Sequence, residues 1–144
     1  HFREFAGLGL TYQILQKPLH SLKLSGNVLH EQTRYSSQLY NYTEFDGSNE
    51  IKAVWGTVYL SGLHSFNNPG MKVYYELYWQ QSTADQVNYR YHFLTGIDFH
   101  LVKALALQSR IIYSHENVID TAVKQNDLLW VWGLAYSFKS RGLE

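Results

Sequence analysis

The sequence predicts an all-β protein: an antiparallel up-and-down meander of about seven to eight strands, forming an outer-membrane type of β-barrel or most of one. Three observations predict this fold. Apolar and polar residues alternate with a period of two almost throughout, the pattern of strands with one apolar face. Aromatic residues make up 16% of the chain, and they fit the pleated surface of a sheet. Many alternating segments reach roughly 10 to 15 residues, longer than typical strands of soluble proteins.

Four strands are predicted in the first half of the chain, each separated from the next by a turn signal or a polar stretch. Pro18 marks a short first turn, and Asp46-Gly47 is a favourable pair for a hairpin turn. The stretch Asn-Asn-Pro-Gly at 67–70 is the clearest turn of the chain. The predicted strands are residues 6–16, 21–35, 50–66 and 71–82.

Three more strands are predicted in the second half. Residues 88–101 place tyrosine, phenylalanine and isoleucine on one face and Arg90, His92, Asp98 and His100 on the other. Residues from about 104 to 116 alternate as well, although their Ala-Leu-Ala-Leu start is also compatible with a helix. Residues 127–138 carry the strongest apolar face of the chain, which includes Trp130 and Trp132. Together these segments form one domain over residues 1–144, which we expect to be the C-terminal portion of a longer barrel.

The connections between the predicted strands alternate between short and long. Outer-membrane barrels have short periplasmic turns and longer outer loops. The alternation therefore favours a barrel in which all short turns lie at one end, together with the end of the last strand. The short connections are 17–20, 67–70 and 101–103, and the longer or more polar ones are 36–50, 83–86 and 117–125.

Alternation alone does not say which face of each strand points inward. A soluble barrel turns its apolar face inward, whereas a transmembrane barrel turns it toward lipid and encloses a polar lumen. Charged residues make up only 17% of this chain, compared with about 25% in soluble domains, which favours the second arrangement. We therefore expect Tyr91, Phe93, Trp130 and Trp132 to point outward. The predicted polar lumen residues are Glu31, Glu76, Arg90, His92, Asp98, His100, Gln108, Arg110 and Glu116.

Two stretches carry a family resemblance. The first is Gly-Leu-Gly-Leu-Thr-Tyr-Gln-Ile-Leu at 7–15, followed by a short turn and an alternating strand, and the second is "NDLLWVWGLAYSF" at 126–138. This order resembles a bacterial family with a domain of unknown function whose members are called salt-induced outer-membrane proteins. The resemblance covers roughly Gly7 to Phe138. It implies an outer-membrane β-barrel of unknown activity, in which this chain corresponds to the later strands, and it supplies no catalytic residues.

Several kinds of chemistry find little support in the sequence. There is no cysteine, and the formal net charge is zero, so neither a thiol nucleophile nor a nucleic-acid partner is indicated. The Gly-Leu-Gly-Leu stretch lacks the third glycine and the following helix of a dinucleotide site. His92 and His100 share a face but lie about 26 Å apart along a strand. We therefore predict no catalytic residues, no cofactor and no metal.

Function is predicted only coarsely. The favoured hypothesis is an outer-membrane protein of a Gram-negative bacterium, without enzymatic activity, with a structural or envelope-stress role or passive passage of small solutes. Its expected partners are membrane lipid and, through open strand edges, other copies of the chain. Two alternatives stay open: a soluble β-barrel that binds an apolar ligand among its aromatic residues, and an outer-membrane lipid hydrolase.

Overall fold

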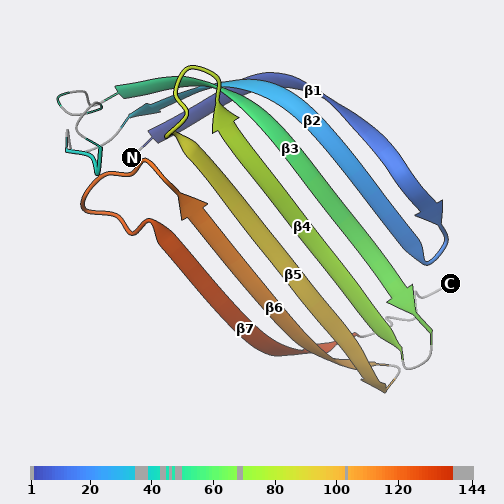
Figure 1. Ribbon diagram of the computed structural model, residues 1–144. Helices are drawn as coiled ribbons and strands as arrows, with labels where there is room; N and C mark the ends of the chain where they lie inside the picture. Colours follow the sequence, from blue (N-terminus) through green and yellow to red (C-terminus); the bar gives the residue numbers. More distant parts are fainter. Residues whose placement is uncertain are drawn as a thin grey trace, which may run out of the picture.

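The computed structural model describes residues 2–34, 39–42, 45, 47, 50–67, 70–102 and 104–137. These residues form a single sheet of seven antiparallel strands, each paired with the next along the chain in the order β1 to β7. Figure 1 shows the strands side by side in one curved layer. The predicted all-β, up-and-down meander is therefore confirmed.

The strands are close to the predicted ones in position and length, from 11 residues in β7 to 17 in β3. The first strand begins at Phe2 rather than at residue 6, because residues 2–5 continue the pairing with the end of β2. The sixth segment is a strand and not a helix, paired along its length with both neighbours. Phe138, the predicted end of the last strand, lies outside the described residues. The bounds are β1 (Phe2–Lys17), β2 (His20–Arg34), β3 (Glu50–Phe66), β4 (Met71–Ser82), β5 (Tyr89–Val102), β6 (Leu105–Glu116) and β7 (Asn126–Tyr136).

Two of the predicted turns contain a glycine with a positive φ. Gly70, next to β4, has a φ of 76°, and Gly47 in the β2–β3 connection has a φ of 86°. Side chains with a Cβ rarely adopt this left-handed conformation, so both positions favour glycine. The remaining turn residues Asp46, Asn68 and Pro69 lie outside the described part of the chain.

The sheet is bent, and its polar face is the concave one. Residues that pair across neighbouring strands share a face, so the registers separate Glu31, Arg90 and Glu116 from Phe93 and the tryptophans of β7. Side chains of strands that are not neighbours touch on the polar face: Arg90 of β5 reaches Glu31 of β2. Arg3 of β1 likewise reaches Glu116 of β6. Such contacts require the sheet to curl around this face.

The sheet is open rather than closed into a barrel. In the part of the chain that the structure describes, β1 pairs only with β2 and β7 only with β6. Seven strands that reverse direction at each turn leave β1 and β7 running parallel to each other. The fold is therefore most of an up-and-down barrel, with two unpaired edges.

Two glycines accommodate tyrosine rings from the neighbouring strand. The ring of Tyr75 lies over Gly62 on the convex face, and the ring of Tyr74 lies over Gly96 on the concave face. A Cβ atom at either glycine would overlap the ring atoms. Each tyrosine ring thus covers backbone that the glycine leaves exposed. Packing an aromatic ring over a glycine in this way stabilises strands that contain glycine.

Candidate functional site

Arg90, on the concave face of β5, is a buried charged residue that is only 5% exposed. Its Nη2 donates to Oε2 of Glu31 at 2.5 Å, and its Nη1 lies 3.2 Å from Oε1 of both Glu31 and Glu116. Its Nε donates to the side-chain oxygen of Gln80. The two-pronged contact with Glu31 is the geometry in which arginine and carboxylate bind most strongly.

A second arginine completes a cluster of two positive and two negative charges. Nε of Arg3 lies 3.0 Å from Oε1 of Glu31, and its Nη2 lies 2.9 Å from Oε1 of Glu116. Thr33 donates its hydroxyl to the same Glu31 oxygen at 2.6 Å. Buried charges are tolerated only when each finds opposite charges and hydrogen bonds. We call Arg3, Glu31, Arg90 and Glu116 the charge cluster.

Aromatic rings complete the surroundings of Arg90. The guanidinium carbon lies 4.4 Å from the ring centroid of Trp55 and 5.7 Å from that of Phe5. A guanidinium over an aromatic face gains a cation–π attraction, which strengthens where water is excluded. Trp55 is 4% exposed. The charge cluster and these rings bring together side chains of β1 through β6 on the concave side at this level of the sheet.

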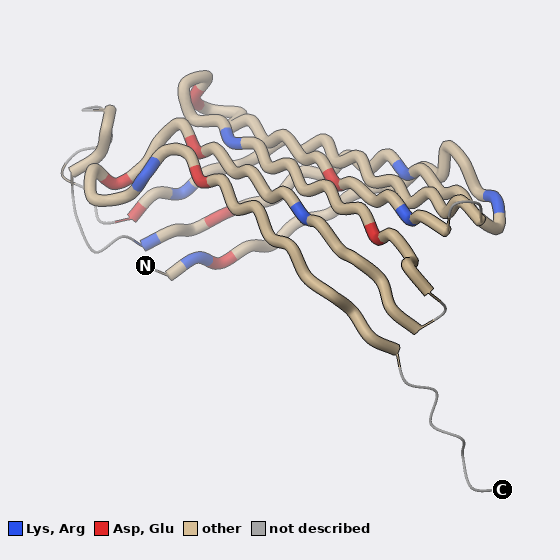
Figure 2. The backbone as a smooth tube through the Cα atoms, turned by 90° about the horizontal axis from the view of Figure 1, so that it is seen from below, with Lys and Arg blue, Asp and Glu red and all other residues tan. Residues whose placement is uncertain are grey.

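Three long connections cover the same end of the sheet. Tyr40 and Asp120 form a bridge between the β2–β3 and β6–β7 connections. Asn41 and Ile119 exchange two hydrogen bonds, of 3.1 and 2.8 Å. The side chain of Asn117 donates to the backbone oxygen of Val87 in the β4–β5 connection at 2.7 Å. Figure 2 shows many of the charged residues gathered toward this end, near the N-terminus.

The convex face has the opposite character. Its side chains are large, apolar and open to the surroundings: Leu8 is 88% exposed, Leu10 is 86% and Trp130 is 60%. An apolar patch that extends over a whole sheet is unusual on a monomeric soluble protein. Other exposed apolar residues of this face are Tyr12, Val28, Val54, Val58, Leu77, Trp79, Phe93, Ile97, Phe99, Leu128, Trp132, Leu134 and Tyr136.

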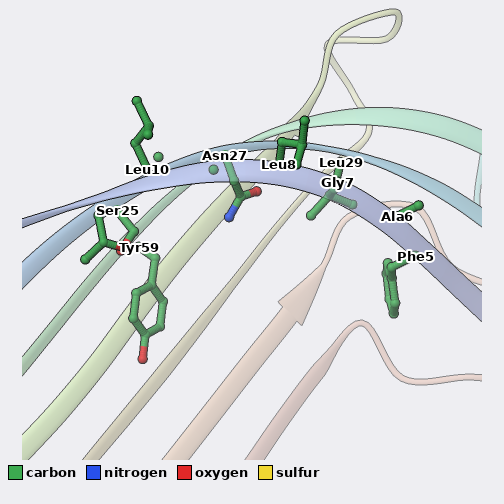
Figure 3. A pocket seen from close by; sticks show the side chains of 12 residues that line it. Phe5, Ala6, Gly7, Leu8, Leu10, Ser25, Asn27, Leu29 and Tyr59 are labelled. Atoms are coloured by element: carbon green, nitrogen blue, oxygen red, sulfur yellow. The ribbon is translucent and has the colours of Figure 1, made fainter.

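The open edge of β1 exposes both faces at once. A groove of about 470 Å³ runs along it, lined by residues of β1, β2 and Tyr59 of β3. Leu8 and Leu10 point to one side of β1, whereas Phe5 and Tyr59 point to the other (Figure 3). The groove therefore follows an unpaired strand edge rather than forming an enclosed ligand pocket.

All nine predicted lumen residues share the concave face by register. The structure brings only Glu31, Arg90 and Glu116 into direct contact. His92 and His100 do not contact each other. His92 contacts Ser114, and His100 contacts the backbone oxygen of Gly70. The remaining residues are Glu76, Asp98, Gln108 and Arg110, of which Asp98 and Gln108 lie opposite each other on neighbouring strands of the concave face. Their role in a lumen stays a prediction.

The sequence reasoning missed one member of the charge cluster, Arg3, and one ring that packs on it, Trp55. Arg3 lay outside the predicted first strand, although alternation extended to Phe2 would have placed it beside Phe5 on the polar face. Trp55 was assigned to neither face, since the outward expectation covered only Trp130 and Trp132 among the tryptophans. Trp55 pairs with Leu29 in the register between β2 and β3, and this pairing identifies the face of Trp55. The sequence of one strand alone does not reveal the pairing.

His92 and Ser114 form the arrangement closest to a catalytic pair. His92 Nδ1 lies 2.8 Å from Ser114 Oγ, within reach for activating a hydroxyl nucleophile. The other described contact of the imidazole is stacking on Tyr78, with ring centroids 5.3 Å apart. A working serine nucleophile also needs a group that orients the base and donors for an oxyanion. The pair by itself therefore does not support the hydrolase alternative.

No helix among the described residues has the length and apolar character needed to cross a membrane.

Comparisons with known proteins identify a family but no close characterised relative. No curated protein and no solved structure matches the chain. The family model "Protein of unknown function, DUF481" matches residues 1–138, nearly the whole chain and every described strand. The chain therefore belongs to this family of unknown function.

Proposed function

We propose that this chain is the wall of a transmembrane β-barrel in the outer membrane of a Gram-negative bacterium, with its convex face toward lipid. The observation that carries the proposal is the direction of curvature. The bend of the sheet turns charged and polar residues into the concavity and leaves leucine, valine and tryptophan on the outside. Lipid is a suitable environment for these outer apolar side chains. Transmembrane barrels likewise turn apolar residues toward lipid and polar residues toward the lumen.

The first alternative, a soluble barrel with an apolar ligand inside, would need the reverse arrangement. Its ligand would sit against the concave face, where Arg90, Glu31 and Gln80 are buried. Burying these groups against an apolar molecule would cost free energy wherever their hydrogen bonds were broken. The curvature therefore favours contact with lipid over an enclosed apolar ligand.

Within the proposed function, the charge cluster supports a structural role over passive passage of solutes. Contacts between β1 and β6 and between β2 and β5 cross the concavity at the level of Arg90. Ions would have to pass these two pairs, of which Arg90–Glu31 is buried and Arg3–Glu116 is partly exposed. Reconstituted in a planar lipid bilayer, the protein is expected to show no stable single-channel conductance, and steady ohmic openings would contradict the structural role.

Tryptophan fluorescence tests the orientation in lipid. Four tryptophans are present, so variants that keep one and replace the others by phenylalanine report on single positions. In vesicles of phosphatidylcholine with brominated acyl chains, a variant keeping Trp132 is expected to be quenched strongly. A variant keeping Trp55 is expected to be quenched weakly, because that ring is buried against Arg90.

Two results would contradict the membrane proposal. One is a chain that purifies as a monomer without detergent and does not bind vesicles. The other is stronger quenching of Trp55 than of Trp132 by the brominated chains. An aqueous quencher such as acrylamide serves as the control, because it separates protection by lipid from protection by protein.

A further inference from the structure

Two histidines meet on the convex face, near the short turns and away from the charge cluster. His20 begins β2 and His64 lies near the end of β3, directly opposite in the register. Their Nδ1 atoms are 3.2 Å apart, and both side chains are half-buried. Within the described ranges, these two are the only histidines whose ring nitrogens contact each other.

Neighbouring aromatic rings hold both imidazoles in place. Tyr75 stacks on His64 with centroids 5.7 Å apart, and its hydroxyl lies 3.2 Å from Nε2 of His64. Phe66 meets His20 edge-on at 5.6 Å. Gly62 allows this arrangement, because any larger residue there would displace the ring of Tyr75. The pair is thus preorganised by packing, so little rotamer entropy remains to be lost on binding.

The separation of 3.2 Å is that of a hydrogen bond between the two rings, and it is also close to the separation that a shared metal ion requires. Imidazole nitrogens bind zinc at about 2.0–2.1 Å, so two such ligands of a tetrahedral ion lie about 3.3 Å apart. A bound ion would take the place of the proton between the two nitrogens. Ligating histidines usually donate their other ring N–H to an oxygen. The Tyr75 hydroxyl is placed to accept such a bond from His64.

We propose that His20 and His64 form a two-histidine binding site for a divalent transition-metal ion such as Cu²⁺ or Zn²⁺. Imidazole ligands suit these ions, and copper binds most tightly of the divalent first-row metals. Among the described residues there is no group of three or more His, Asp or Glu side chains suited to a metal, so the protein would supply two ligands only. Water would supply the others, because both histidines are half-exposed and lie at the strand ends beside the turns, outside the middle of the lipid-facing surface. Lys17, opposite His20, is exposed, so solvent screens its charge. The inference does not rest on the proposed function.

Copper binding to the full chain in detergent micelles tests this site. The parent protein for the test carries His1→Ala, which removes a competing imidazole that lies outside the described residues. Pulsed electron paramagnetic resonance of bound Cu²⁺ is expected to show two coordinated imidazoles. His20→Ala and His64→Ala should each leave one imidazole and weaken binding by about tenfold or more, since the second ligand then no longer acts in the same molecule.

A positioning variant and a control complete the test. Tyr75→Phe keeps the stacked ring but removes the hydroxyl, so copper affinity should fall by about tenfold with both imidazoles still bound. His92→Ala, on the opposite face, should bind copper like the parent. The inference is overturned if the parent shows fewer than two imidazoles, if His92→Ala weakens binding as much as His64→Ala, or if neither His20→Ala nor His64→Ala has an effect.

Discussion

At the scale of single residues, the structure depends on Arg90. Two arginines and two glutamates from β1, β2, β5 and β6 neutralise one another, and Arg90 is the member with contacts to both glutamates and to Gln80. Such a cluster adds little stability compared with an apolar core, but losing one partner leaves an uncompensated buried charge. The residue is therefore critical even though the cluster is electrically neutral.

Replacing Arg90 by alanine is expected to destabilise the fold by about 3–5 kcal/mol, because Glu31 would remain buried with a charge that only Arg3 opposes. The measurement is equilibrium unfolding in urea, followed by the fluorescence of Trp55. Arg110→Ala is the matched control, since Arg110 is exposed and contacts Tyr74 only at 5.8 Å. It should change the free energy of unfolding by about 0.5 kcal/mol or less. Equal effects of the two variants would contradict the assigned role.

Two glycines of the concave face provide a second residue-scale prediction. In Gly96→Ala the new Cβ would overlap the ring of Tyr74, so the ring must move, at a cost of about 1–3 kcal/mol. A Cβ at Gly133 would meet nothing within 4 Å, so Gly133→Ala should be neutral within about 0.5 kcal/mol. Thermal unfolding followed by circular dichroism compares the two. An unchanged midpoint in Gly96→Ala would show that Tyr74 does not cover that glycine.

At the scale of an element, β5 shows how one strand serves two environments. Phe93 lies on the convex face and is 37% exposed, whereas its neighbour Leu94 lies on the concave face opposite Glu76. The two residues are adjacent in sequence, similar in size and both apolar. They differ in the face from which they project, so they form a matched pair for testing which face contacts lipid.

Phe93→Arg is expected to destabilise the protein in phospholipid vesicles by about 2–4 kcal/mol, the cost of arginine near the middle of the lipid-facing surface. Leu94→Arg should cost about 1 kcal/mol or less, because it gains Glu76 as a neighbour. Folding into vesicles, measured by the shift in gel mobility on heating, gives both values. If Leu94→Arg were the more damaging change, the concave face would be the apolar environment and the proposed orientation would be wrong.

At the scale of the whole molecule, the open sheet is the dominant feature. β1 and β7 run parallel, so closing the sheet on itself would require a parallel seam in an otherwise antiparallel fold. The 16 residues of β1 instead present an edge that another strand can join. Unpaired edges of this length promote association between chains unless charge, proline or covering segments protect them.

We therefore expect the chain to self-associate in detergent micelles, and sedimentation should give a protein mass above that of one chain. The absence of native cysteine makes chemical cross-linking selective. Leu8→Cys, at the edge, should form dimers with a flexible bis-maleimide, whereas Leu60→Cys, in the interior strand β3, should form far fewer. A single-chain mass at all concentrations would contradict this expectation.

The sequence by itself determined the strands, their antiparallel order and the division of each strand into an apolar and a polar face, because a period of two encodes all three locally. It also identified Glu31, Arg90 and Glu116 as members of one face. Only the tertiary structure decided which way the sheet bends, because alternation is the same for either curvature. The bend depends on contacts such as that between Arg90 and Glu31, which are 59 residues apart in the chain. Such contacts also joined Arg3 to the cluster and placed Trp55 over Arg90. The strand order, in turn, left β1 and β7 as open edges.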